Sequence, residues 1–467
     1  MTDFASLSAA DLARLYARGE ISPVDVVRDC FARIEKFNPA INAFNVLDRE
    51  GALATASESE ARWKKGEARG PADGIPATIK DNVWLKGFPS RRGSLTSDDA
   101  PMKEDAPATA RLREAGAPIL GKTTLPEFGW IGACHSPLTG ITRNPWDLSR
   151  TTGGSSGGAA AAALLNLGWL HVGTDGAGSI RIPAAFTGVF GIKQSFGRVA
   201  AYPASPFSVL AHVGPLTRTV TDAATMLSVI ARPDTRDMMA WNTPAPDYRI
   251  GLNDGVAGLR IAWSPKLGGN ARVDPEVAAA TADAAKVFAD LGAHVEEADP
   301  ELPNAEDLIR KLWYAVSAYI VAGLSTEKRE LLDPGFAAIA KQGKNYDLHD
   351  WFIAYTARFE LSKAMSKFHE RYDLLLSPTM PVPAIEAGRV TPADGSYGDE
   401  WINWSPFTYP FNLTQQPAAS VPCGLTKAGL PIGLQIVGPM REDALVLRAA
   451  RAFESVRPFA NLSAPRM

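Results

Sequence analysis

The sequence contains little that is typical of a secreted, membrane-bound or nucleic-acid-binding protein. Its only cysteines are Cys30, Cys134 and Cys423, an odd and scattered set that argues against a disulfide framework or a thiolate metal site. The formal net charge is −3, so the chain offers no basic surface for a phosphate backbone. No long apolar run occurs, and the N-terminus lacks the pattern of a secretion signal. We therefore expect a cytoplasmic protein with neither nucleic acid nor membrane as a partner.

The histidines give no sign of a metal site either. None of the six occurs in an HExxH motif or a similar ligand spacing; they are His135, His171, His212, His294, His349 and His369. We expect no metal and no cofactor, and we expect His171, inside the apolar run 169–172, to be structural. A serine–histidine–aspartate triad stays open because its members meet only in space, although the chain has no Gly-x-Ser-x-Gly elbow to anchor one.

Local patterns predict an alternation of helices and strands. Ser22 followed by Pro23 is typical of a helix N-terminus, and a second, polar helix is expected over 48–67. A strand at 259–263, an alanine-rich helix at 276–291 and a strand at 294–297 form a strand–helix–strand unit, which implies a partly parallel sheet. No Pro/Ser-rich linker separates two halves, so the pattern favours one large α/β domain.

Two clusters of glycine and serine stand out in the segment 151–193. The first, 153–158, could be a flexible linker by composition, but an Ala/Leu helix, a strand and a second glycine cluster follow it directly. Gly176, Gly178 and Ser179 belong to that second cluster. Glycines beside a serine let several N–H groups point toward one spot, which is how an oxyanion hole is built.

These clusters, with a lysine upstream, closely resemble the hallmark of the amidase signature family. The matching stretches cover most of the chain: 74–76, 80–82, 122–129, 144–146, 153–158, 173–181, 214–216, 417–422 and 429–438. The resemblance implies that Ser179 is the nucleophile, that Ser155, after a cis peptide bond, is the bridging serine, and that Lys80 is the base.

The resemblance also implies residues that support these three. The expected oxyanion hole consists of the N–H groups of Gly176, Ala177, Gly178 and Ser179. The residues expected to fix the two loops by hydrogen bonds are Ser156, Asp175 and Arg181. Many family members have glycine at the position of Ala177, so a positive φ at this alanine would be strained.

The family fold is a single large α/β domain in which helices cover both faces of a mixed, twisted β-sheet. For this chain it implies one amidase domain over 1–467. Within it we expect an N-terminal helical layer at 1–70, the amidase signature core at 71–220, and the rest of the sheet with the substrate-pocket helices and loops at 221–467. The resemblance leaves a homodimer open.

The resemblance implies hydrolysis of an amide C–N bond in a small molecule, either a carboxamide, an anilide or a carbamate (urethane), through an acyl-enzyme. The alternative within the family is the glutaminase subunit of a tRNA-dependent amidotransferase. In that subfamily a glutamine is expected after the Ser-Ile-Arg stretch, to match a polar substrate, and here that position is Ile182. A catalytically silent binding relative is a further alternative.

A nucleotide-binding protein is the last alternative, because Gly116 to Thr123 matches the pattern GxxxxGK[ST]. That motif needs a strand before it and a helix starting at its lysine, whereas here a helix-like stretch precedes it and we expect a turn leading into a strand. For the substrate pocket, the variable segments 130–137, 307–324 and 401–411 are the expected walls. Their aromatic residues are candidates to line it: Trp313, Tyr314, Tyr319, Trp401, Trp404, Phe407 and Tyr409.

Overall fold

A computed structural model describes residues 3–269 and 271–459. Its strands are β1 (Phe44–Leu47), β2 (Ala77–Lys80), β3 (Ile119–Thr123), β4 (His135–Ser136), β5 (Gly140–Ile141), β6 (Arg143–Asn144), β7 (Asp147–Thr151), β8 (Leu170–Asp175), β9 (Phe190–Lys193), β10 (His212–Thr217), β11 (Arg260–Trp263), β12 (His294–Glu297), β13 (Leu374–Pro378), β14 (Ala418–Leu425) and β15 (Pro431–Val437).

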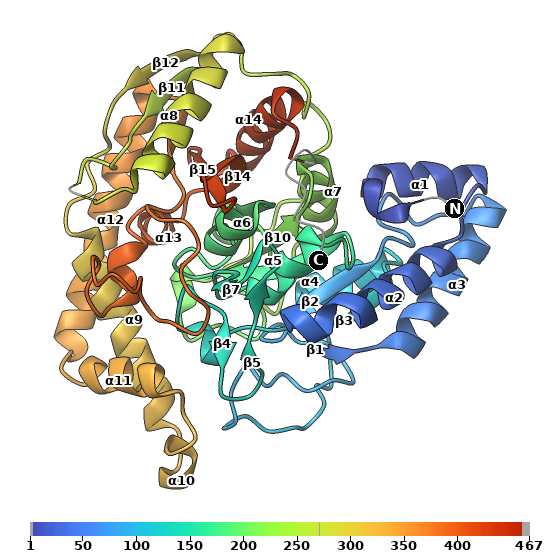
Figure 1. Ribbon diagram of the computed structural model, residues 1–467, viewed down its shortest axis with the longest axis horizontal. Coiled ribbons are helices and arrows are strands. Elements are labelled where there is room, and N and C mark those ends of the chain that lie inside the picture. Colours follow the sequence, from blue (N-terminus) through green and yellow to red (C-terminus); the bar gives the residue numbers. More distant parts are fainter. Residues whose placement is uncertain (1–2, 270, 460–467) are drawn as a thin grey trace.

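The helices surround these strands (Figure 1). They are α1 (Ala9–Arg18), α2 (Pro23–Ile41), α3 (Arg49–Lys65), α4 (Pro107–Glu114), α5 (Gly157–Leu164), α6 (Arg181–Thr187), α7 (Val220–Ile230), α8 (Pro275–Asp290), α9 (Ala305–Ala322), α10 (Thr326–Arg329), α11 (Pro334–Gly343), α12 (Leu348–Arg371), α13 (Pro410–Leu413) and α14 (Asp443–Val456). Short 3₁₀ turns lie at Phe4–Ser6, Glu127–Gly129, Ser208–Leu210 and Trp401–Trp404.

One eleven-stranded sheet runs through the molecule in the order β1-β3-β2-β8-β10-β9-β14-β15-β13-β11-β12. Strand β2 pairs in parallel with β3 and β8, and β11 pairs in parallel with β12 and β13. The ladders from β8 through β10, β9, β14 and β15 to β13 are antiparallel. The sheet is therefore mixed, as predicted, and the strand–helix–strand unit β11-α8-β12 is confirmed.

Helices cover both faces of this sheet. Along β9, Phe190 and Ile192 belong to the large core cluster that also contains residues of α7, α8 and α14. Between them, Gly191 faces α6 so closely that an added Cβ would lie 2.9 Å from the Cβ of Ala184. Because successive residues of a strand point to opposite faces, α7, α8 and α14 lie on one face, and α6, which contacts α5, lies on the other. The predicted α/β fold class is confirmed.

Most of the locally predicted elements are present. The side chain of Ser22 accepts a hydrogen bond from the N–H of Val24 at the start of α2, and α3 matches the expected polar helix. Residues 1–70 also contribute β1 to the sheet, next to β3. Helix α6 was not predicted, because all seven of its residues are buried and it therefore lacks the amphipathic period that marks a surface helix.

The segment that matches the nucleotide-binding pattern has the predicted turn-and-strand structure. Helix α4 ends before Gly116, and the lysine of the pattern, Lys122, lies inside β3. Its Nζ is 3.1 Å from Oδ1 of Asp81, and both side chains are fully buried. Lys122 also donates to the backbone oxygens of Asp81 and Pro89, so its ammonium group is engaged inside the protein and does not face a phosphate.

Different groups of helices lie at the two ends of the molecule. Figure 1 shows α1, α2 and α3 (blue) together at one end and α9, α11 and α12 (yellow to orange) at the other, with the sheet between them.

Within the described residues, no helix combines the length and the apolar character needed to cross a membrane.

The first prediction concerns the core beneath α8 and α14. Phe288 of α8 is fully buried and stacks on Phe453 of α14, with ring centroids 5.6 Å apart. We expect Phe288→Ala to reduce the free energy of unfolding by about 3–5 kcal/mol, because it removes apolar contacts and leaves a cavity. Urea denaturation followed by circular dichroism measures the change.

Phe359→Ala is the matched control, because Phe359 on α12 is 59% exposed. Its effect on unfolding should stay within about 0.5 kcal/mol. Equal losses for the two variants would contradict the described packing of α8 on α14.

Candidate active site

The three residues expected to carry the chemistry come from three separate segments on one side of the sheet. Lys80 is the last residue of β2, Ser155 lies in the loop before α5, and Ser179 lies in the turn between β8 and α6. The parallel pairing of β2 with β8 brings the end of β2 next to that turn. All three side chains are buried, and both serines line one cavity.

The amine of Lys80 is surrounded by hydroxyl groups. Its Nζ is within hydrogen-bond distance of three of them: Oγ of Ser155 at 2.7 Å, Oγ of Ser156 at 2.9 Å and Oγ1 of Thr174 at 2.8 Å. None of these partners carries a charge that would hold the ammonium form. Burial lowers the pKa of Lys80 to about 7, so near neutral pH a large fraction of this lysine is the neutral amine, which can accept a proton.

The two serine loops are joined directly. The peptide bond between Gly154 and Ser155 is cis, and the N–H of Ser156 donates to the backbone oxygen of Ser179 at 3.1 Å. The Ser156 hydroxyl donates to the backbone oxygen of Thr174 and accepts from the N–H of the same residue. Ser156 thus connects the loop of Ser155 to strand β8 and to the Ser179 turn.

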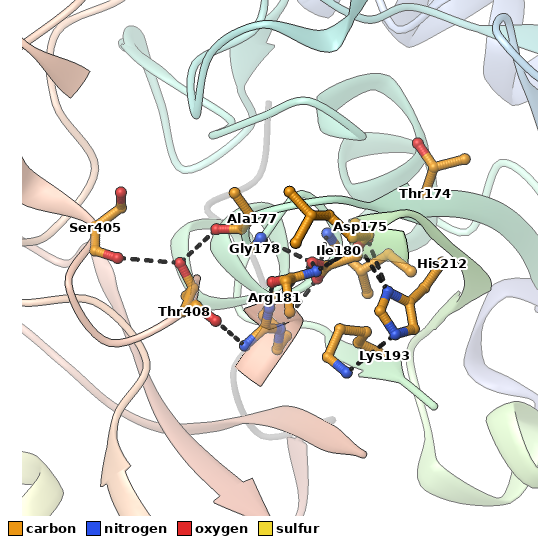
Figure 2. Close-up of polar contacts among 12 residues, drawn as sticks. Thr174, Asp175, Ala177, Gly178, Ile180, Arg181, Lys193, His212, Ser405 and Thr408 are labelled. Carbon is orange, nitrogen blue, oxygen red and sulfur yellow. Dashed lines mark hydrogen bonds and ion pairs between the residues drawn. The ribbon is translucent and has the colours of Figure 1, made fainter. Parts of the chain in front are cut away.

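A buried ion pair holds the Ser179 turn in shape (Figure 2). Oδ1 of Asp175 lies 3.0 Å from Nη2 of Arg181, and Oδ2 accepts from Nε of the same guanidinium. Oδ1 also accepts from Asn412 Nδ2, and Oδ2 accepts from the N–H of Ile180. Burial alone would raise the pKa of Asp175, but the contact with Arg181 outweighs it and holds that pKa well below its usual range.

The same carboxylate uses one of the amides expected in the oxyanion hole. The N–H of Gly178 donates to Oδ1 of Asp175 at 2.7 Å, so this amide is already engaged and would have to leave that carboxylate to bind an oxyanion. The positive φ of the turn, 125°, is at Gly178. Ala177 does not have a positive φ, so the strain considered for an alanine at this position does not arise.

Thr408, which no local pattern pointed to, fixes the other side of the same peptide group. Its Oγ1 donates to the backbone oxygen of Ala177 at 2.7 Å, and its own backbone oxygen accepts from Nη1 of Arg181 at 2.8 Å (Figure 2). The carbonyl of Ala177 and the N–H of Gly178 belong to one peptide plane. Thr408 and Asp175 therefore hold this plane from both sides.

The cavity above the two serines has a volume of about 360 Å³, within the usual range for sites that bind small molecules. Its aromatic walls come mainly from segments that were not predicted to form it. The aromatic side chains that line it are Trp84, Phe128, Tyr202, Phe207 and Trp313. Phe207 stacks on Trp313, and Trp84 contacts Tyr202 edge to face.

Of the seven aromatic residues considered as candidates for the pocket wall, one lines the cavity. Trp313 lines it, whereas Tyr319 points to solvent with 74% of its surface exposed. The other five, Tyr314, Trp401, Trp404, Phe407 and Tyr409, are buried core residues. Ile182 is also buried, behind Gly178, and lies outside the set of described residues that line the cavity. Its apolar side chain therefore does not face this cavity.

Two histidines of the sheet, His171 and His212, are buried, and their lowered pKa values keep both imidazoles neutral. Nδ1 of His171 is 2.9 Å from Oγ1 of Thr78, and burial lowers the pKa of His171 to about 4. Burial, with the neighbouring Lys193, also holds the pKa of His212 well below its usual range. Across residues 3–269 and 271–459, the His, Cys, Asp and Glu side chains form no cluster of three that could hold a metal ion.

Comparison with known proteins adds two lines of evidence from sequence. The profile of the Amidase family matches residues 25–447. The acylamidase of Rhodococcus erythropolis is 38% identical over 462 residues, which cover 97% of this chain and 96% of the relative. A glutamyl-tRNA(Gln) amidotransferase subunit of Myxococcus xanthus is 37% identical over 488 residues, which cover 98% of this chain and 99% of that relative.

Solved structures agree with the sequences. A bacterial aryl acylamidase of the amidase signature family superposes with a TM-score of 0.92 at 30% identity, over 100% of both chains. A 6-aminohexanoate cyclic dimer hydrolase superposes with a TM-score of 0.87 at 29% identity, over 98% of both chains. Together with the family match over most of its length, these similarities establish that the chain belongs to the amidase signature family.

Proposed function

We propose that the protein hydrolyses the amide C–N bond of small molecules, with Ser179 as nucleophile, Ser155 as proton relay and Lys80 as base. The observation that carries this proposal is the contact of 2.7 Å between Nζ of Lys80 and Oγ of Ser155, in a buried site where both serines face one cavity. The similarity to proteins named acylamidase and aryl acylamidase supports the reaction type.

Hydrogen-bond counting supports the role of Lys80. The Ser156 hydroxyl uses its proton toward the backbone oxygen of Thr174, so it accepts an N–H from Lys80. A neutral amine has two N–H groups and one lone pair. If one N–H goes to Ser156 and the other to Thr174, the lone pair is left for the proton of Ser155. Lys80 can then take that proton as Ser155 takes one from Ser179.

The reaction then proceeds in two halves. Oγ of Ser179 attacks the amide carbon, while the amides of Gly176, Ala177 and Ser179 stabilise the developing oxyanion. The proton held by Lys80 returns through Ser155 to the departing amine, which leaves an acyl group on Ser179. Water, deprotonated through the same relay, attacks the acyl-enzyme and releases the acid.

The walls of the cavity favour substrates with apolar or aromatic parts. Phe128, Phe207 and Trp313 offer flat apolar surfaces, which suit an aryl or alkyl group of an anilide, a carboxamide or a carbamate. The alternative, a glutaminase component of an amidotransferase, is favoured by the similarity to the amidotransferase subunit of Myxococcus xanthus. Glutamine as the best substrate in a panel of aliphatic amides, anilides and carbamates would establish that alternative.

The first test of the proposal is the nucleophile. We expect Ser179→Ala to abolish amide hydrolysis while the circular dichroism spectrum stays that of the wild type. A fluorophosphonate should label the wild type on Ser179, and mass spectrometry of the digested protein locates the label. Full activity in a folded Ser179→Ala variant, or a label on another serine, would refute the assignment.

The second test is the pH dependence of hydrolysis. Because only neutral Lys80 can accept a proton and its pKa is about 7, kcat/KM for a neutral amide should rise with pH through an apparent pKa near 7 and level off above it. Lys80→Arg should lower kcat/KM by orders of magnitude and remove this rise, because a guanidinium stays protonated. A profile of the wild type that is flat between pH 5 and 9 would contradict Lys80 as the base.

The third test concerns Thr408 as a positioning residue. Thr408→Val keeps the shape of the side chain but removes the hydroxyl that holds the carbonyl of Ala177. We expect kcat to fall by roughly 10-fold or more, about the value of one hydrogen bond, with little change in KM.

Thr408→Ser is the matched control, because it keeps the hydroxyl, and it should recover most of kcat. The amide and matched ester of one acyl group should lose kcat together in Thr408→Val, since both form an oxyanion. A loss of thermal stability with kcat unaltered would leave Thr408 with a purely structural role.

A further inference from the structure

We infer that the substrate pocket contains an anion subsite formed by Arg92, so that amides carrying a carboxylate away from the scissile bond are preferred over neutral amides of the same shape. The inference rests on the proposed amide hydrolysis and specifies its substrate class. Arg92 lines the same cavity as Ser155 and Ser179.

The charges in the cavity wall support this inference by elimination. The other acidic or basic side chains that line the cavity in the described chain are Asp98, Asp175 and His212. Asp98 is paired with Lys328 at 3.2 Å, Asp175 is paired with Arg181 at 3.0 Å, and His212 is neutral because burial and Lys193 hold its pKa well below the usual range.

Arg92 differs from these groups. Within residues 3–269 and 271–459 its guanidinium has neither a carboxylate partner nor a hydrogen bond, and it lies 5.3 Å from the centroid of the Phe128 ring. Its neighbour Arg91 pairs with Asp99 instead. Arg92 is thus the one charged side chain in the cavity wall of the described chain that has no ion-pair or hydrogen-bond partner, and apolar walls strengthen the field of such a charge.

The backbone of Arg92 is held close to the proposed catalytic groups. The N–H of Phe128 donates to the backbone oxygen of Arg92 at 2.8 Å. Two residues further on, Ser94 donates from its hydroxyl to the buried carboxylate of Glu127 at 2.6 Å. Next to Phe128, Gly129 lies so close to Ser155 that an added Cβ would be 3.1 Å from its Oγ. The segment that carries Arg92 is therefore packed against the loop that contacts Ser155.

A guanidinium in this position suits a carboxylate. Its planar set of N–H groups binds a carboxylate through two parallel hydrogen bonds, and the Phe128 ring restricts the side chain by a cation–π contact. An aromatic body of the substrate could pack on Phe207 and Trp313 while its carboxylate reaches Arg92.

The experiment compares two pairs of amides that differ in one carboxylate. In the first pair, acetanilide is neutral and para-acetamidobenzoate carries a carboxylate on the amine side. In the second pair, the anilide of hexanoate is neutral and the mono-anilide of adipate carries a carboxylate on the acyl side. In the wild type we expect kcat/KM to be roughly 10-fold or more higher for the charged member of one pair, as for a hydrogen bond between charged groups. The preference should decrease as ionic strength rises.

Variants then assign the preference to Arg92. Arg92→Gln should reduce the ratio of charged to neutral kcat/KM by 10-fold or more, and Arg92→Glu should invert it. Arg91→Gln is the matched control and should keep the ratio of the wild type, because Arg91 is engaged with Asp99. Equal kcat/KM within both pairs in the wild type, or a preference that survives Arg92→Gln, would overturn the inference.

Binding separates this inference from the proposed function. Calorimetry on Ser179→Ala, with and without Arg92→Gln, measures the affinity for each amide without turnover. If the amide with the carboxylate binds more tightly and this difference is lost in Arg92→Gln, the subsite is supported, even if no amide in the panel is hydrolysed. Absence of hydrolysis would refute only the proposed function. No difference in affinity within either pair would refute the subsite, whatever the hydrolysis assay gives.

Discussion

The buried ion pair between Asp175 and Arg181 is the contact on which the rest of the site depends. Both side chains are fully inaccessible to solvent, where an unpaired charge would be strongly unfavourable. The carboxylate binds two amides of the Ser179 turn, and the guanidinium reaches Gln435 of β15 and the backbone of Thr408. One pair thus ties the turn after β8 to the C-terminal half of the sheet.

The proposed base is made possible by the opposite kind of surroundings. The amine of Lys80 is as buried as Asp175, but its hydrogen-bond partners are the neutral hydroxyls of Ser155, Ser156 and Thr174. Without a carboxylate in contact, burial lowers the pKa of Lys80. Two buried titratable groups within one site therefore differ in charge: Asp175 is held as an anion by Arg181, whereas Lys80, without an opposite charge in contact, is shifted toward its neutral form.

The cavity combines elements from distant parts of the chain. Its aromatic walls include Trp84 and Phe128 from the first third, Tyr202 and Phe207 from the middle, and Trp313 from α9. The segments that surround the reacting groups are held by buried hydrogen bonds, whereas Arg92 is exposed and has no partner among the described residues. This contrast separates the parts that position the chemistry from the part that we expect to select the substrate.

The sequence by itself determined the structural features that depend only on residues adjacent along the chain. The helix start at Ser22, the turn and strand around Lys122, and the two glycine-rich turns with their serines were all predictable, since caps, turns and glycine conformations are local properties. Only the tertiary structure decided which groups meet in space. Thr408 lies 231 positions from Ala177, the amide of Gly178 is taken by Asp175, and Trp84 and Tyr202 replace most of the expected aromatic wall. No local pattern specifies these contacts, because they arise where the sheet and its loops bring remote segments together.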